Sequence, residues 1–383
     1  MSSPTRVILV RHGRSTYNDQ GRYQGSSNDA VLTEKGMTTA RQVGRFLRDT
    51  SIQAVYSSPL QRVTQTVNSI LCELQKMSAK PIPITIDNNL REIDLPTWEG
   101  LSYKTVKEQF SEDYRCWKER PHEFALMPSQ SPDSQLQGVL HQSSGGGTAT
   151  VAKTTAHYPV RALYQRSQQF WQTMLPLHTG QTVLIVSHGG TLHALVSMAL
   201  KLAPKHHHRL QQSNCGISIL KFTDQQVQLQ QLNNTAPLGE TLPKLKACKQ
   251  GLRLLLVAEE SLLEVHPHTL CQRLAAITPD FCLASREDLA HKLLQHSPTT
   301  LQLATIEANF LPNWQQRLEQ SARRQSTLMT GIVIAPTCNI QILLIQALGG
   351  HPQNASQIHI EPEQLSIIHY PPSHRPVVQA INF

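Results

Sequence analysis

The chain has 383 residues, of which 39% are hydrophobic and 16% charged, and its formal net charge is +8. This length allows two domains or one large one, and no apolar run approaches the roughly 20 residues that span a bilayer. The arginines are dispersed and no helix-turn-helix, zinc-finger or RNP motif is present, which disfavours a nucleic-acid partner. The seven cysteines contain no CxxC pair and no secretory signal precedes them, so we expect a cytoplasmic protein with free thiols.

The positive charge is concentrated in the first 240 residues, where 24 Lys and Arg face 17 Asp and Glu. The remaining residues carry 11 basic against 10 acidic side chains. A pocket for a small anion such as phosphate needs cations that the rest of the fold does not neutralise. The charge distribution therefore indicates that the first part of the chain attracts small anions.

Four short β-rich apolar runs are separated by longer helical patterns, and they occupy residues 6–10, 54–57, 83–86 and 182–186. The runs are almost continuously apolar, which is typical of strands buried on both faces. Between the first two runs, Thr33 can cap a helix whose apolar face contains Ala40, Val43 and Phe46. This alternation predicts an α/β fold with a mostly parallel sheet.

Two polar segments divide the chain. Residues 129–156 are rich in Gly, Ser and Gln, and we expect a flexible insertion there. Residues 233–250 read as a linker. We therefore predict one domain over residues 1–240 and a second over residues 251–383.

The second half repeats the pattern of the first. Residues 251–261 (GLRLLLVAEES) parallel residues 4–15 (PTRVILVRHGRS), and residues 331–350 parallel residues 181–200 in the same way. Such self-similarity indicates a duplicated domain. The second copy is degenerate, because the charged residues of the first copy are replaced: Ala258-Glu259 stand for Arg11-His12, Leu289 for Arg62 and Thr337 for His188.

Charged side chains follow several of the predicted strands. Arg11 and His12 end the first run, and His188 and Gly189 follow the run at 182–186. Glu92 comes shortly after the run at 83–86, and Arg62 lies early in the helix after the second run, where Ser58 can act as N-cap. Ligands of such sheets bind at the carboxyl ends of the strands, so we expect these side chains to meet there.

The types of these residues favour a phosphate over a metal ion. Two histidines and two arginines repel one another unless an anion joins them. A zinc ion would need a third ligand and would be repelled by Arg11 and Arg62. We therefore expect neither a metal nor another cofactor, and we expect the histidines of residues 205–209 (KHHHR) to lie in a solvated loop.

Five segments resemble, in order and spacing, the histidine phosphatase or phosphoglycerate mutase-like superfamily: RHGRSTYN, GRYQGSSNDAVLTEKG, YSSPLQRVTQT, LREIDLPTWEG and VSHGG. The resemblance covers about residues 5–235. Within the superfamily, the chain is most similar to two-domain 2-carboxy-D-arabinitol-1-phosphatase-like proteins of cyanobacteria and plastids. The resemblance implies a three-layer α/β/α phosphoglycerate mutase-like domain, followed here by the degenerate copy.

The resemblance also implies the chemistry. His12 would take the phosphoryl group while Arg11, Arg62 and His188 bind its oxygens. Glu92 would protonate the leaving group and then activate water. The residues expected to contact the substrate or its phosphate are Arg11, Arg62, Asn18, Gln24, Gly25 and Gly189. The implied activity is metal-independent hydrolysis of a small phosphorylated metabolite of the sugar-phosphate type through a phosphohistidine intermediate.

Two alternatives stay open. A mutase of the same fold would keep the phosphohistidine and return the phosphoryl group to a rotated intermediate. A regulatory or binding protein would instead depend on the degenerate second half, which could also cover the first domain, form a homodimer or bind an effector.

Overall fold

The computed structural model describes residues 3–75, 81–126, 156–224, 226–246, 248–264, 268–294, 302–305 and 314–383. Apart from its last residue, the predicted insertion at 129–156 lies outside the described residues. Within these ranges no helix combines the length and the apolar character needed to cross a membrane.

The first half of the chain builds a six-stranded sheet. Its spatial order is β3 (Ile84–Ile86), β2 (Ala54–Ser57), β4 (Thr182–Ser187), β1 (Thr5–Arg11), β5 (Ile217–Phe222) and β6 (Val227–Asn234). The first four strands run parallel, and β5 and β6 are antiparallel to their neighbours. The predicted α/β class with a mostly parallel sheet is thus confirmed.

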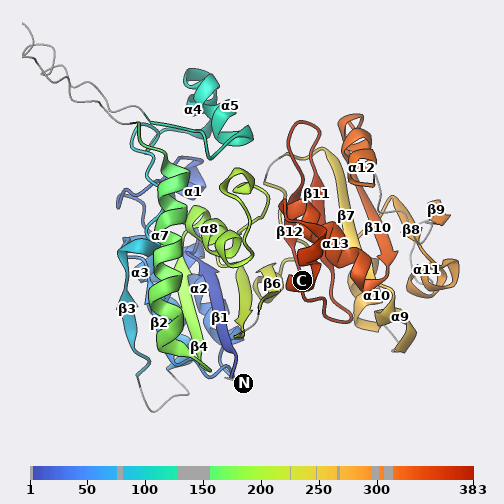
Figure 1. Ribbon diagram of the computed structural model, residues 1–383, viewed down its shortest axis with the longest axis horizontal. Coiled ribbons are helices and arrows are strands. Elements are labelled where there is room, and N and C mark those ends of the chain that lie inside the picture. Colours follow the sequence, from blue (N-terminus) through green and yellow to red (C-terminus); the bar gives the residue numbers. More distant parts are fainter. Residues whose placement is uncertain are drawn as a thin grey trace, which may run out of the picture.

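Helices cover both faces of this sheet, which gives the three layers (Figure 1). The helices α2 (Glu34–Phe46) and α3 (Gln61–Leu74) lie on one face, and α7 (Pro159–Met174) and α8 (Gly189–Ala199) on the other. Successive side chains of β1 point to opposite faces: Ile8 and Val10 pack with α2 and α3, while Val7 and Leu9 pack with α7 and α8. Both faces are apolar, as the continuous apolar run predicts.

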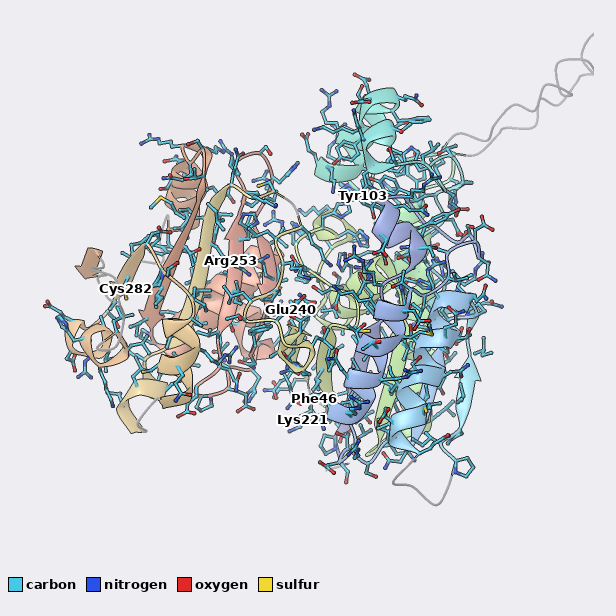
Figure 2. The ribbon with its side chains drawn as sticks, turned by 180° about the vertical axis from the view of Figure 1, so that it is seen from behind. Phe46, Tyr103, Lys221, Glu240, Arg253 and Cys282 are labelled. Carbon is cyan, nitrogen blue, oxygen red and sulfur yellow. The ribbon has the colours of Figure 1, made fainter. Side chains whose placement is uncertain are left out.

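Three local expectations need correction. Thr33 caps α2 as predicted, but Phe46 is the last residue of that helix and is 49% exposed (Figure 2). Within the described part of the chain, strand β3 pairs with β2 alone, and its Ile84 and Ile86 are exposed rather than buried on both faces. Ser58 is not the N-cap of α3, because the helix begins at Gln61 and is preceded by Leu60.

Short elements lie around the carboxyl edge of the sheet: α1 (Thr16–Gln20), η1 (Asn88–Leu90), α4 (Tyr103–Gln109), α5 (Ser111–Glu119) and η3 (Pro204–His206). At the opposite edge, η2 (Leu175–His178) leads into β4. The α4 and α5 pair stands above the carboxyl edge in Figure 1. An aromatic cluster of Trp98, Trp117 and Phe124 fixes it to the domain, with ring centroids 4.9 to 6.0 Å apart.

The second half repeats the topology of the first. Its sheet has the order β9 (Gln302–Thr305), β8 (Phe281–Ala284), β10 (Leu328–Ala335), β7 (Gly251–Ala258), β11 (Ser366–Tyr370) and β12 (Val377–Ala380). Strand by strand, this is the order and the direction of the first sheet. The shared topology supports the predicted second copy, while the domain limits at 240 and 251 stay a prediction.

The second sheet also lies between helices. On one face are α9 (Glu260–Glu264), α10 (His268–Ala275) and α11 (Glu287–Leu294), and on the other α12 (Trp314–Arg323) and α13 (Thr337–Leu348). Pro336 follows β10 directly and is the N-cap of α13, as His188 follows β4 and is the N-cap of α8. Pro336, rather than the predicted Thr337, therefore stands in the place of His188.

The two sheets meet at their last strands, β6 and β12, which lie side by side in Figure 1. Leu232 and Ile381 exchange backbone hydrogen bonds of 3.0 and 3.1 Å. Around this bridge one continuous cluster of buried side chains includes Leu229 and Leu232 from the first half and Leu254 and Val378 from the second. The two halves therefore share part of their hydrophobic core.

Candidate active site

The carboxyl ends of three neighbouring strands carry the residues singled out from the sequence. Arg11 is paired with Ser187 across β1 and β4, and Ser57 with Val186 across β2 and β4. Because these strands are parallel and in register, the residues that follow them, His12, Ser58 and His188, lie at one edge of the sheet.

His12 and His188 form the centre of this edge. Their ring centroids are 5.3 Å apart in an edge-to-face arrangement, and both side chains are buried. Nδ1 of His12 lies 2.8 Å from the carbonyl oxygen of Gly13, so this nitrogen carries the proton and donates. In a neutral His12 ring, Nε2 then keeps its lone pair, and a ring nitrogen with a free lone pair can act as a nucleophile.

Two arginines lie beside the histidines. Arg62 is completely buried and donates to the carbonyl oxygens of Ser27 and Gly25, each at 2.8 Å. Arg11 donates to the carbonyl of Gln212 at 2.9 Å. The Nε groups of both guanidinium groups are buried without a partner among the described residues, and neither arginine forms an ion pair there. Unsatisfied buried donors of this kind are satisfied when an anion binds between them.

Burial, followed by the neighbouring positive charges, lowers the pKa values of these groups. Burial, followed by Arg11 and Arg62, holds the pKa of His12 well below its ordinary value. Burial, followed by Arg62 and His12, does the same to the pKa of His188. Burial also lowers the pKa of Arg62 to about 10. Both imidazoles are therefore neutral at pH 7, and both arginines stay charged.

Glu92 reaches the same edge from the segment after η1. Its carboxylate accepts backbone hydrogen bonds from Ile93 at 2.9 Å and from Gly190 and Thr191 at 3.2 Å. The last two donors belong to the first turn of α8, directly after His188. The positive end of this helix thus faces the carboxylate and holds it next to the histidine pair.

The predicted substrate-contact residues surround this centre. Gln24, Gly25 and Gly189 line a cavity of about 330 Å³ together with Arg11 and Glu92. Gly25 has a φ of +50°, and a Cβ there would lie 2.1 Å from Oε1 of Glu99, so only glycine fits.

The remaining predicted residues lie beneath the cavity surface. His12, Arg62 and His188 are not among its lining residues but lie in the buried layer beside Arg11 and Glu92. Asn18 accepts a hydrogen bond from Asn214 at 3.0 Å, and Asn214 donates to the carbonyl of His12. Asn18 thus reaches the centre through Asn214.

Several further residues hold the site in place, and the sequence interpretation missed their roles. Ser58 lies 2.8 Å from Nε2 of His188, and Thr66 accepts a hydrogen bond from the backbone of Gly13. Arg166 of α7 donates to the carbonyl oxygens of Arg91 and Glu92 at 3.0 and 3.1 Å. The position of Ser58 directly after β2 could have indicated its role, whereas Arg166 is 74 residues from Glu92 and gives no local signal.

The histidines of residues 205–209 do not form a solvated loop, contrary to expectation. His207 is buried, and His207 and His208 both line the cavity. Nε2 of His208 lies 2.8 Å from the carbonyl oxygen of Trp117. The ring centroids of His208 and Trp117 are 4.7 Å apart. His207 and His208 are withdrawn from solvent because Trp117 of α5 packs against both rings.

Comparison with known proteins gives a consistent result. A model of the histidine phosphatase superfamily (branch 1) matches residues 7–140 and 146–235. The chain is 35% identical over 217 residues to the probable 2-carboxy-D-arabinitol-1-phosphatase of Arabidopsis thaliana, covering 57% of this chain and 38% of that protein. It is 33% identical over 265 residues to 2-carboxy-D-arabinitol-1-phosphatase of Triticum aestivum, covering 68% of this chain and 46% of that protein. The matched part is less than half of each plant relative.

Among solved structures, the alpha-ribazole phosphatase from Shigella flexneri is similar with a TM-score of 0.45 and 23% identity. This match covers 60% of the present chain and 96% of that one.

Proposed function

The chain belongs to the histidine phosphatase superfamily, and from this premise we propose that it is a metal-independent phosphomonoesterase that acts through a phosphohistidine intermediate. The substrate is a small phosphorylated metabolite of the sugar-phosphate type. The observation that carries the proposal is the His12 ring. Its protonated Nδ1 donates to the carbonyl of Gly13, and its Nε2, which has no hydrogen-bond partner among the described residues, lies beside two buried guanidinium groups whose Nε atoms also have none there.

In the first step, Nε2 of His12 attacks the phosphorus atom and the ester P–O bond breaks. The negative charge that spreads over the phosphoryl oxygens is stabilised by Arg11, Arg62 and His188. These groups are fixed before the substrate arrives, because backbone carbonyls and Ser58 already hold them. Little reorganisation is then needed in the transition state.

Glu92 carries the proton in both steps. As a general acid it donates a proton to the leaving alkoxide oxygen, and the alcohol departs. A water molecule then attacks the phosphohistidine, and the Glu92 carboxylate takes its proton. The reaction releases inorganic phosphate and restores His12 and Glu92. The place of Glu92 in the cavity wall, beside Arg11, supports this role.

The substrate class is inferred from two sources. The plant relatives are named for hydrolysis of a carboxylated sugar-alcohol phosphate. The cavity of about 330 Å³ has the size of a small-metabolite site and is lined by both polar and apolar side chains. We therefore propose a small organic phosphate rather than a phosphoprotein.

The proposal is tested by p-nitrophenyl phosphate hydrolysis in the presence of EDTA. We expect turnover by the natural chain and a loss of at least about a thousandfold in His12→Ala, because the nucleophile is gone. His291→Asn, an exposed histidine of α11, is the control and should retain activity. Loss of activity in EDTA, or full activity of His12→Ala, would overturn the proposal.

The mutase alternative is distinguished from the phosphatase by the products of the reaction. A mutase converts 3-phosphoglycerate into 2-phosphoglycerate with little free phosphate, whereas a phosphatase releases phosphate. A regulatory protein would turn over neither p-nitrophenyl phosphate nor 3-phosphoglycerate. Rapid quenching should also trap an acid-labile phosphoryl group on the natural chain and none on His12→Ala.

A further inference from the structure

Lys246 brings a further cation to the candidate active site from outside the matched residues 7–235. It lies in the segment between β6 and β7 and lines the cavity beside Arg11. Its Nζ donates to the carbonyl oxygen of Gln212, which also accepts from Arg11. Among the described residues, neither cation forms an ion pair with a carboxylate.

This position is unusual for a lysine. The residue as a whole is exposed, so its flexible side chain could direct the ammonium group into water. Instead the ammonium turns inward and shares one oxygen atom with a guanidinium group. Burial of the ammonium group, followed by the nearby charge of Arg11, holds the pKa of Lys246 well below its ordinary value, and an anion bound against both groups would stabilise the charged ammonium.

The surroundings of Lys246 also suit an anion. A second cavity, of about 690 Å³, shares Lys246, Lys118 and Trp117 with the first. We call this second cavity the vestibule. Its basic side chains come from both halves of the chain and outnumber the single acidic one, Glu119: Lys118, Arg120, Lys205, Arg209, Lys246 and Arg375. Such a lining attracts anions toward the site.

Three imidazoles complete the wall near Lys246. The side-chain nitrogens of His193, His207 and His208 lie within 4.8 Å of one another. Burial lowers the pKa of each, and Lys246 and His207 add to the effect on His193. Neutral imidazoles could in principle hold a metal ion, but the nearby cations Lys246 and Arg11 oppose a second positive charge. The same cations favour an anion.

We infer that Lys246 binds a second anionic group of the substrate, a carboxylate, next to the phosphoryl group that is transferred. This inference rests on the proposed phosphatase function. Lys246 is then a specificity-determining residue, and the segment after residue 240 contributes directly to substrate recognition. A substrate whose only anionic group is the transferred phosphate makes no contact with Lys246 and gains no binding energy from this residue.

The test compares substrates that differ only in the second anionic group. The pairs are 3-phosphoglycerate with glycerol 3-phosphate, and 6-phosphogluconate with sorbitol 6-phosphate. The natural chain should prefer the carboxylated member of at least one pair in kcat/KM. Lys246→Met should reduce this preference by about tenfold or more, because a charge-assisted hydrogen bond is lost. Lys246→Arg should restore most of it.

Lys249→Met provides a matched control from the same segment. Lys249 is exposed and lines neither cavity, so its loss should leave the preference unchanged. Calorimetric titration of His12→Ala with each pair gives a second readout that does not depend on turnover. Here too, Lys246→Met should weaken binding of the carboxylated member more than that of the alcohol.

The outcomes separate this inference from the proposed function. If p-nitrophenyl phosphate is hydrolysed through His12 but no pair shows a preference that depends on Lys246, the anionic subsite is wrong and the phosphatase stands. If p-nitrophenyl phosphate is not hydrolysed, the proposed function fails first. Stoichiometric zinc binding that is lost in His193→Ala, together with a carboxylate preference that EDTA removes, would assign recognition to a metal and overturn the role of Lys246.

Discussion

At the scale of single residues, hydrogen bonds to backbone carbonyls determine what each histidine can do. The carbonyl of Gly13 fixes the proton of His12 on Nδ1 and leaves Nε2 for chemistry. The sequence motif Arg-His-Gly predicts the residues but not this proton position, because the position depends on how the backbone turns after β1. The tautomer of His12 is therefore a property of the folded backbone rather than of the motif.

His207 offers a test of how burial affects stability. Burial lowers its pKa to about 4. In the unfolded chain the pKa returns to about 6.5, so the unfolded state binds an extra proton between pH 6.5 and 4. Folding stability from this group is therefore complete above pH 6.5 and decreases as the pH falls toward 4.

We predict that His207→Gln makes the free energy of unfolding less dependent on pH. One proton contributes about 1.4 kcal/mol per pH unit within the window. Urea unfolding at pH 7.5, 6.0 and 5.0 measures the slope, and His157→Gln, which replaces an exposed histidine, is the control. Equal slopes for His207→Gln and the natural chain would show that His207 is not held neutral by the fold.

At the scale of elements, the sequence predicts strands best where an apolar run forms a strand that the fold buries on both faces. The strands β1, β2 and β4 are central and apolar on both faces, so their ends, with Arg11, His12 and His188, were correctly located. Strand β3 has the same apolar pattern but lies at the edge of the sheet, where one neighbour is missing. A short apolar run does not show which strands lie beside it in the sheet. For this reason the sequence predicts burial for Ile84 and Ile86, which the structure leaves exposed.

Long-range contacts explain the other differences. The run at residues 205–209 is polar and suggests solvent, yet it packs against Trp117, about 90 residues earlier. The vestibule likewise combines α5, this run and residues 374–377 of the second half. Such combinations depend on how the two halves meet, which the sequence pattern does not encode.

The helix α7 illustrates a positioning role at this scale. Arg166 donates to the carbonyls of Arg91 and Glu92, and so ties the segment that carries Glu92 to a rigid helix. We predict that Arg166→Met lowers kcat for p-nitrophenyl phosphate by about tenfold with a smaller change in KM, because Glu92 is no longer held beside the leaving group.

Two measurements distinguish this positioning role from simple destabilisation. Arg166→Lys should recover part of kcat, because one donor returns. Arg161→Met is the matched control on the same helix, since Arg161 donates to the carbonyl of His122 outside the site. If Arg161→Met lowers kcat as much as Arg166→Met does, the effect comes from the helix as a whole.

At the scale of the whole molecule, the second copy has lost the anion site in a specific way. Glu259 stands in the place of His12. The backbone N–H of His12 donates to the carbonyl of Ser187, the last residue of β4, and that of Glu259 donates to the carbonyl of Ala335, the last residue of β10. Beside it, the Glu260 carboxylate accepts from the backbone and the hydroxyl of Thr337 at the start of α13. The side chain of Glu260 thus occupies the helix end that corresponds to the proposed phosphate side of the first copy.

The retained second copy contributes to the folding of the first. Leu229 and Leu232 of β6 are fully buried, and they belong to the cluster that also contains Leu254 and Val378. Without the second half, these side chains and the outer edge of β6 would face water. The two halves should therefore unfold together rather than as independent units.

We predict a single unfolding transition for peptides of both halves when hydrogen exchange is followed by mass spectrometry across a urea series. Leu232→Asp should lower the midpoint for both halves, because an unpaired carboxylate in the shared core costs several kcal/mol. Leu263→Asp places the same charge on a side chain that is 51% exposed and should leave both midpoints nearly unchanged. Separate midpoints for β1 and β7 in the natural chain would contradict this prediction, because a shared core cannot lose one half while the other stays intact.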